Sequence, residues 1–422
     1  MYKKTLLALS VSLAAALSLS ACGGGASSSS GGGDGKTLTI ASNTNEKAAL
    51  DAVIAKFKEK NPGVDVKYTT SAVDQNQTTT RTQLSSGTAP DVFFVWPGLG
   101  NPLATQIIAK AGFLEDLSGQ PWADSVPAGI KRVTQFEGKT YSAPVTFSGI
   151  GAIYNMNAVN EAGLTPPTTW SGLLQFCSQA KAKGKTAFAL GAQTNWVTQL
   201  IPYALTPTLV YGPEPGFADD MANGKASFAD SKWSEAMNKY LEMQKNGCFQ
   251  ANPLGTDYEA TLSMVSKGEA LGVVQTSSAI AALSKQAPGT QLKLLAVPAT
   301  DNAGDTRMAG AASASYAVNA KAKNKDLAIK FINFLQSPDG MNVYAETNRA
   351  LPVVANDAFK VDPAVEALQE YNKEGKTDPY MDSAWPNPRV QQTLFQVIQD
   401  MLAGKTDPAS GLKQMDSAYK GS

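Results

Sequence analysis

Histidine is absent from the 422 residues of this chain. Without an imidazole, the protein cannot build a Ser-His-Asp or Cys-His nucleophile, a histidine-ligated zinc site or a histidine base that works at neutral pH. The absence removes most of the familiar hydrolase mechanisms. We therefore predict a protein with no catalytic residue, no bound metal and no cofactor.

Charged residues are also scarce, at 17% of the chain, where about 25% is typical of globular proteins. Lys plus Arg and Asp plus Glu are equal at 36 each, so there is no basic excess to neutralise a phosphate backbone. This balance argues against nucleic acid as a partner. The hydrophobic fraction of 43% and the length predict large cores divided between two lobes.

The N-terminal segment has the pattern of a secretion signal. Lys3 and Lys4 precede an uncharged run that ends at Ala21, too short for comfortable membrane spanning. Its last residues, Leu19-Ser20-Ala21-Cys22, resemble a bacterial lipobox, which predicts a signal peptide over 1–21 and lipidation of Cys22. A chance cysteine beside an ordinary cleavage site is the alternative.

Glycine and serine dominate the residues that follow Cys22. They offer no side chains that can bury apolar area, so we expect 22–36 to be a lipidated cysteine and a flexible tether. The protein is then expected outside the cytoplasm, anchored by lipid to the outer face of the bacterial cell membrane.

Only two cysteines, Cys177 and Cys248, remain after Cys22. In an exported chain disulfides persist, and two cysteines pair without remainder. We therefore predict a Cys177–Cys248 disulfide, with two buried free thiols as the alternative.

Hydrophobic periodicity predicts alternating strands and helices. Residues 37–40 alternate as a strand, 50–57 carry apolar residues at helical spacing, and 64–68 alternate again, which together make a βαβ unit. The apolar run at 90–96 is typical of a parallel strand buried on both faces. Residues 149–155 and 186–191 predict strands of a second α/β lobe, so ligand is expected at the carboxyl ends of the strands.

Further helices are predicted at about 231–246, at 327–335, where Pro338 ends the helix, and after Pro363 and Pro388. Strands are predicted at 270–274, 292–297 and 316–318. No repeat of solenoid period is visible.

Several segments together resemble the extracellular solute-binding proteins of bacterial ABC importers, particularly those that bind oligosaccharides. The segments that carry the resemblance are Asn61-Pro62-Gly63-Val64, Leu84–Val92, Pro167-Thr168-Thr169-Trp170, Lys267-Gly268-Glu269-Ala270 and Asn324-Lys325-Asp326-Leu327-Ala328. Each is weak alone, but their order and spacing make the set specific.

The resemblance implies a two-lobed α/β fold of the type II periplasmic-binding-protein kind, with an open, mostly parallel sheet in each lobe. Three hinge crossings are expected near 144–148, 308–312 and 349–353. The N-lobe would comprise 37–146 and 309–348, and the C-lobe 147–308 and 349–422.

The resemblance also implies capture of a neutral carbohydrate by hinge closure and its delivery to ABC permease subunits, by a monomer. Sugar binding uses flat aromatic faces together with amide and carboxylate groups that satisfy the hydroxyls. Trp96 follows a strand, Asn195 and Trp196 occupy a loop of the second lobe, and Trp385 lies in a turn-rich segment that borders the cleft in related proteins. The remaining candidates are Thr44, Asn45, Glu46, Thr146, Phe147, Gln275, Ser277, Ala312 and Arg349.

Structural roles are the alternative for several of these candidate residues. Trp96 could be a core residue, the residues at 43–46 could cap a helix, and Arg349 could form an ion pair between the lobes. Trp122, Trp170 and Trp233 are expected to be structural. Other functions also stay open: binding of a peptide, an amino acid, a polyamine or an oxyanion; a surface glycosidase that uses two carboxylates; or an adhesin or scaffold.

Overall fold

The computed structural model describes residues 35–421, in which two β-sheets organise the chain. The predicted signal peptide, Cys22 and nearly all of the predicted tether lie outside the described residues. Within the described part, no helix is long and apolar enough to cross a membrane.

The first sheet is five-stranded in the order β2-β1-β3-β12-β6. Both β2 and β3 run parallel to β1, whereas β12 is antiparallel to β3 and β6. The strands are β1 (Thr37–Asn43), β2 (Asp65–Ser71), β3 (Val92–Val95), β6 (Ala143–Pro144) and β12 (Ser315–Val318). Its helices are α1 (Lys47–Lys60), α2 (Val73–Ser86), α3 (Thr105–Lys110), α4 (Ala128–Thr134), α12 (Lys325–Leu335) and α13 (Pro338–Thr347), and β4 (Gln135–Phe136) and β5 (Lys139–Thr140) form a separate hairpin. We call this group of elements the N-lobe.

The second sheet is seven-stranded and is built around the long strand β7 (Thr146–Asn155). Its other strands are β8 (Thr186–Ala189), β9 (Ala270–Thr276), β10 (Leu292–Leu295), β11 (Met308–Ala312), β13 (Leu351–Pro352) and β14 (Thr377–Asp378). Its helices are α5 (Met156–Glu161), α6 (Trp170–Ala182), α7 (Leu200–Thr206), α8 (Phe217–Ala222), α9 (Trp233–Lys245), α10 (Tyr258–Ser266), α11 (Ala279–Gln286), α14 (Glu366–Lys373), α15 (Pro388–Leu402) and α16 (Pro408–Lys420). We call this group the C-lobe.

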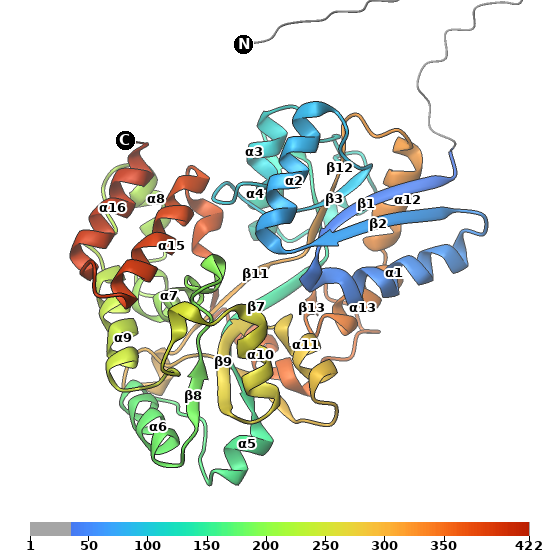
Figure 1. The fold of residues 1–422 in the computed structure, drawn as a ribbon. Coiled ribbons are helices and arrows are strands. Elements are labelled where there is room, and N and C mark those ends of the chain that lie inside the picture. Colours follow the sequence, from blue (N-terminus) through green and yellow to red (C-terminus); the bar gives the residue numbers. More distant parts are fainter. Residues whose placement is uncertain (1–34, 422) are drawn as a thin grey trace, which may run out of the picture. The chain divides into compact units, whose positions relative to one another are not determined.

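The prediction of a mostly parallel sheet is wrong for the C-lobe. Strand β7 pairs antiparallel with β9, β10, β11 and β13, and the parallel pairs of this sheet are β8 with β9 and β11 with β14. For one of these pairs the path of the chain gives the reason: β7 enters the C-lobe from the N-lobe and β11 leads back to the N-lobe, so these two strands run in opposite directions (Figure 1).

The βαβ unit at 37–71 is confirmed. The apolar face of α1 predicted at 50–57 is buried, with Leu50, Val53 and Phe57 at 0% exposure, and it joins the core of the first sheet. Lys60 ends the helix, and Gly63 then adopts φ +88°, a left-handed conformation that glycine reaches without a Cβ penalty. The chain thus returns into β2 beside β1.

The chain passes between the two sheets at three places within the described residues. The first is Val145, between β6 and β7, and the third is Arg349-Ala350, between α13 and β13. The second is Ser313-Ala314, which lies after the predicted 308–312 because those residues form β11 and pair with β7. In Figure 1, β7 and β11 run side by side between the labelled elements of the two lobes.

The helix pattern at the C-terminal end was only partly predictable. Pro338 does not simply end the preceding helix, because Ser337 caps α13 and Pro338 occupies its first turn. Asp407 and Pro408 begin α16 in the same way. The helix predicted after Pro388 is confirmed, and the one after Pro363 begins at Glu366.

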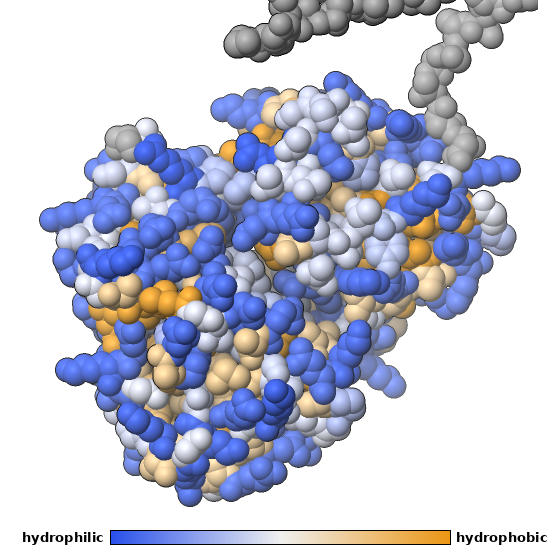
Figure 2. All heavy atoms as spheres, in the orientation of Figure 1, coloured by the Kyte–Doolittle hydropathy of each residue, from blue (hydrophilic) through white to orange (hydrophobic). Residues whose placement is uncertain are grey.

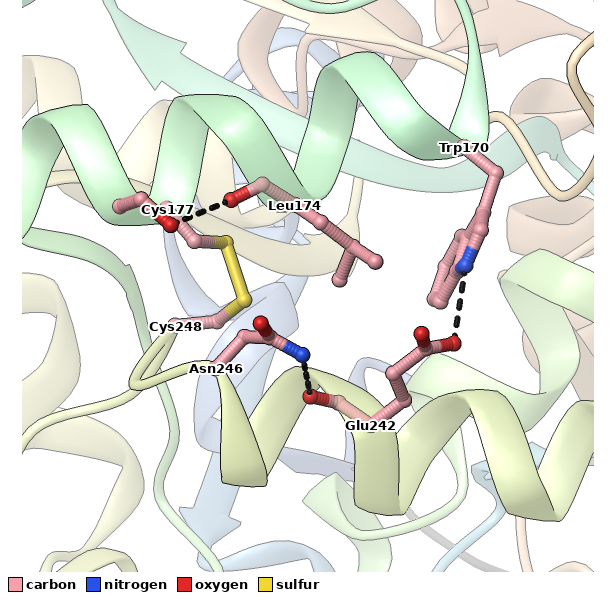
Figure 3. Close-up of a disulfide and its surroundings, with 7 residues drawn as sticks. Trp170, Leu174, Cys177, Glu242, Asn246 and Cys248 are labelled. Carbon is pink, nitrogen blue, oxygen red and sulfur yellow. Dashed lines mark hydrogen bonds between the residues drawn. A yellow bond between two sulfur atoms is a disulfide. The ribbon is translucent and has the colours of Figure 1, made fainter.

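The predicted disulfide between Cys177 and Cys248 is present in the structure. It joins α6 to the segment that follows α9, and Figure 3 shows the indole of Trp170 reaching from α6 toward Glu242 on α9. Trp170 Nε1 donates a hydrogen bond to Glu242 at 3.0 Å. A covalent and a polar link therefore tie α6 to α9 and to the segment that follows it.

Candidate functional site

A cleft of about 300 Å³ lies between the two lobes and is lined by residues of both sheets. Asn43 ends β1, Trp96 follows β3 and Thr276 ends β9, so the cleft lies at strand ends, as predicted for open α/β sheets. Figure 2 shows the face of Figure 1 as a surface in which the two lobes meet along a groove with mainly hydrophilic residues on either side.

Aromatic rings face this cleft from both lobes. Trp96 of the N-lobe packs edge-on against Phe94, with the ring centroids 4.6 Å apart. Trp196 of the C-lobe lies in a short 3₁₀ helix, Asn195–Val197, and its ring centroid is 5.0 Å from that of Tyr258. Both tryptophans are half-buried, so each keeps part of its ring available to a ligand.

The N-lobe side of the cleft carries a buried carboxylate, Glu46. The hydroxyl of Tyr344 donates to its Oε2 at 2.8 Å, and Asn348 Nδ2 donates to the same oxygen. Burial raises the pKa of Glu46, and these two hydrogen bonds oppose that effect. Both bonds end on Oε2, so Oε1 carries neither of them.

The residues that precede Glu46 cap a short helix, and two of them also line the cleft. Asn43 accepts a hydrogen bond from the backbone of Asn45 and so caps the short helix Thr44–Glu46, as the competing interpretation expected. Asn43 and Asn45 also line the cleft, whereas Thr44 is exposed and does not.

The C-lobe side carries a second carboxylate, Asp382. Burial raises the pKa of this carboxyl group to about 6. Gln391 Nε2 donates to its Oδ2 at 2.9 Å. Tyr203 lies beside it with 1% exposure, and its hydroxyl makes no hydrogen bond of ordinary geometry among the described residues. Sequence reasoning missed these three residues because only their neighbour Trp385 stood out.

The prediction that Trp385 borders the cleft is not met. The residue is 3% exposed, does not line the cleft, and packs edge-on against Tyr203 and Phe228 in the C-lobe core. Segments distant in sequence supply this packing. Trp122, Trp170 and Trp233 are buried, as predicted.

At the end of β9, the residues that line the cleft are displaced by one position from the predicted ones. Gln275 and Ser277 are fully buried and do not line the cleft, whereas Thr276 and Ser278 do. Strand side chains alternate between faces, so a choice that is wrong by one residue selects the opposite face. No pattern in the sequence indicates which of these side chains point toward the cleft.

The candidates at the passages between lobes have different outcomes. Phe147 and Ala312 line the cleft. Thr146 is buried and forms a hydrogen bond with Ser313 at 2.9 Å, so it ties two of the passages together instead. Arg349 forms an ion pair with Asp362, 13 residues further along the chain, and does not line the cleft.

Asn195 also lies outside the main cleft. Its side chain is exposed, accepts a hydrogen bond from Gln399 at 3.1 Å, and lines a neighbouring hollow that shares Asp74 and Gln77 with the cleft. Within residues 35–421, no cluster of Cys, Asp and Glu has an arrangement that could hold a metal ion.

Two α/β lobes, three connecting passages and a cleft with aromatic and polar walls define a two-lobed binding protein. The chain belongs to the family described as bacterial extracellular solute-binding protein, whose model matches residues 41–342.

Among the similar proteins is a multiple sugar-binding protein of Streptococcus mutans, 26% identical over 316 residues, which are 72% of each chain. A solute-binding protein solved in complex with raffinose superposes with a TM-score of 0.77 at 21% identity, over 91% of this chain and 99% of that one. A Bacillus licheniformis sugar transporter protein in complex with stachyose has a TM-score of 0.72 at 20% identity, over 91% and 99% of the two chains. The structures support the type II fold.

Proposed function

We propose that this protein captures a carbohydrate in the cleft between its lobes and delivers it to the permease subunits of an ABC importer, without breaking a bond. The observation that carries the proposal is the pair of half-buried indole rings, Trp96 and Trp196, on opposite walls of one cleft that also presents amide and carboxylate groups. Sugar rings need both kinds of surface. The names of the sugar-binding relatives agree with this ligand class.

The mechanism we propose is closure. A ligand that touches both lobes binds the closed arrangement more tightly than the open one and shifts the population toward it. The passages at Val145, Ser313-Ala314 and Arg349-Ala350 are the segments we assign to the hinge. The permease would then recognise the closed form.

We further propose that Cys22 carries a lipid that anchors a monomer to the outer face of the membrane. The lipobox-like sequence before Cys22 supports this, and family membership supports a location outside the cytoplasm. Cell fractionation of the Cys22→Ala variant tests the anchor: the variant should move from the membrane fraction to the medium. Retention in the membrane would contradict it.

A thermal-shift screen with mono- and oligosaccharides tests carbohydrate capture. A bound sugar at 100 times its Kd should stabilise the protein by about 2.7 kcal/mol. Trp196→Ala and Trp96→Ala should each weaken binding about tenfold, since an aromatic contact contributes about 1 kcal/mol beyond the area it buries. Trp122→Phe, which changes a buried tryptophan outside the cleft, is the matched control. A peptide or a polyamine that binds where no sugar does would overturn the proposal.

A further inference from the structure

The charged groups of the cleft all have one sign. Its charged lining residues are Glu46, Asp74 and Asp382, and among the described residues no lysine or arginine lines it. The first lies on the N-lobe wall, the second at the exposed start of α2 on the rim, and the third on the C-lobe wall.

Among the described residues, three of the cations that neighbour lining residues in sequence are paired elsewhere, and Arg132, next to Val133, is exposed and does not line the cleft. Lys47 pairs with Asp51, Lys131 with Asp124 and Lys376 with Glu374. Arg81 of α2 lines the neighbouring hollow and not the cleft. The carboxylates therefore face the cleft without a balancing positive charge on its walls.

A buried carboxylate without a counter-charge is costly, and that cost falls when a ligand brings a positive charge. Burial raises the pKa of both Glu46 and Asp382, which agrees with this electrostatic setting. A protonated amine also forms hydrogen bonds to carboxylates that are about twice as strong as those of neutral donors.

The cleft wall beside Asp382 also carries a buried hydroxyl. The hydroxyl of Tyr203 is buried, lines the cleft beside Asp382, and makes no hydrogen bond of ordinary geometry within residues 35–421. A buried polar group without a partner is costly and is expected to have one in the functional state. A ligand with both hydroxyl and amine groups would satisfy Tyr203 and the adjacent carboxylate together.

The aromatic walls fit the same ligand. The electron-rich faces of indole rings attract ammonium groups as well as the C–H faces of sugar rings. Trp96 and Trp196 thus suit a solute that combines an apolar ring face with a positive charge. A simple polyamine lacks the ring face, and an acidic sugar would meet like charge on both walls.

We infer that the cleft selects carbohydrates that carry a protonated amine over neutral or acidic ones, with Glu46 and Asp382 as the charge-selecting residues. This inference rests on the proposed function, because it names the chemical class of the sugar.

The test compares oligosaccharides of one length and one linkage that differ in a single substituent. Calorimetric titration at pH 7, above the pKa of about 6 of Asp382, would use the β-1,4-linked tetramers of glucosamine, glucose and N-acetylglucosamine. We expect the glucosamine tetramer to bind at least about tenfold more tightly than the other two, the difference expected between a charge-assisted and a neutral hydrogen bond.

Two variants and a control separate charge selection from a general loss of structure. Asp382→Asn and Glu46→Gln should each weaken binding of the glucosamine tetramer about tenfold and change binding of the glucose tetramer by less than about threefold. Asp357→Asn, at an exposed carboxylate outside the cleft, should change neither. Circular dichroism and thermal unfolding of each variant check that it is folded.

The outcomes also separate this inference from the proposed function. If a neutral oligosaccharide in these titrations or in the thermal-shift screen binds as tightly as the glucosamine tetramer, or more tightly, amine selection is overturned and carbohydrate capture stands. If Asp382→Asn and Glu46→Gln weaken the neutral and amine tetramers equally, charge selection is also overturned. If no saccharide binds but spermidine does, both proposals fall.

Discussion

The backbone N–H of Leu99 in the N-lobe donates a hydrogen bond to the carbonyl oxygen of Ser383 in the C-lobe at 3.3 Å. Glycines flank Leu99, and this contact explains why. A Cβ on Gly98 would overlap the carbonyl oxygen of Ser383, and a Cβ on Gly100 would overlap that of Asp382. The two backbones can approach this closely only because both positions lack a side chain.

Substitution of Gly100 should therefore prevent full closure at this edge of the cleft. We expect Gly100→Ala to weaken ligand binding about tenfold, a loss of about 1.4 kcal/mol, and to leave the free energy of unfolding little changed. Titration and small-angle scattering with and without ligand would measure it. Gly119→Ala, with no atom within 4 Å of the added Cβ, is the control. Equal affinity for Gly100→Ala and the wild type would refute a closing role.

The raised pKa of Asp382 predicts an effect of pH on stability. The folded-state pKa of about 6 exceeds the ordinary value of 3.8, so the folded protein binds a proton more readily than the unfolded chain and loses stability as pH rises from about 4 to 6. Asp382→Asn should therefore stabilise the ligand-free protein by about 2 kcal/mol at pH 7 and hardly at all at pH 4. Urea unfolding at both pH values would measure the difference. The same gain at both pH values would contradict the raised pKa, and Asp357→Asn should show no gain at either.

Loss of the Cys177–Cys248 disulfide should destabilise the protein. The bond closes a separation of 71 residues, and the chain-entropy estimate for such a loop is about 4 kcal/mol. The double variant Cys177→Ala with Cys248→Ala should lower the urea midpoint, and a reducing agent should lower the midpoint of the wild type but not that of the variant. A wild-type midpoint that is insensitive to reduction would count against a bonded pair.

Substitutions of Trp385 and Trp196 should show their main effects in different assays. Trp385→Ala removes a core side chain and should lower the free energy of unfolding by about 3–5 kcal/mol, whereas Trp385→Phe should retain more of it. Trp196→Ala should cost less stability, because the ring is only half-buried, and more affinity. Paired unfolding and titration curves would separate them. A Trp385→Ala variant of wild-type stability would show that the core placement is wrong.

Local patterns predicted much of the fold because they depend on neighbours in sequence. The face of α1 at Leu50, Val53 and Phe57 was predictable in this way. The disulfide was predictable for another reason, because only two cysteines follow Cys22. The antiparallel pairing of β7 was not predictable, because its partner strands are distant in sequence.

The site was predictable to the level of loops but not of side chains. The loop ends at Asn45, Trp96 and Trp196 reach the cleft because strand ends gather there. Trp385 and Gln275 do not reach the cleft. Segments distant in sequence bury Trp385, and tertiary packing decides which face of the strand Gln275 points to. The charge of the cleft emerges only when residues from 46, 74 and 382 are brought to one place.

The ring of Tyr258 lies behind that of Trp196 and tilts toward it at 57°. This support restricts the indole before any solute arrives, so the rotational freedom of the side chain is lost during folding and not during capture. A solute that stacks on the open face then meets a plane already in place, and more of the contact energy is left for affinity.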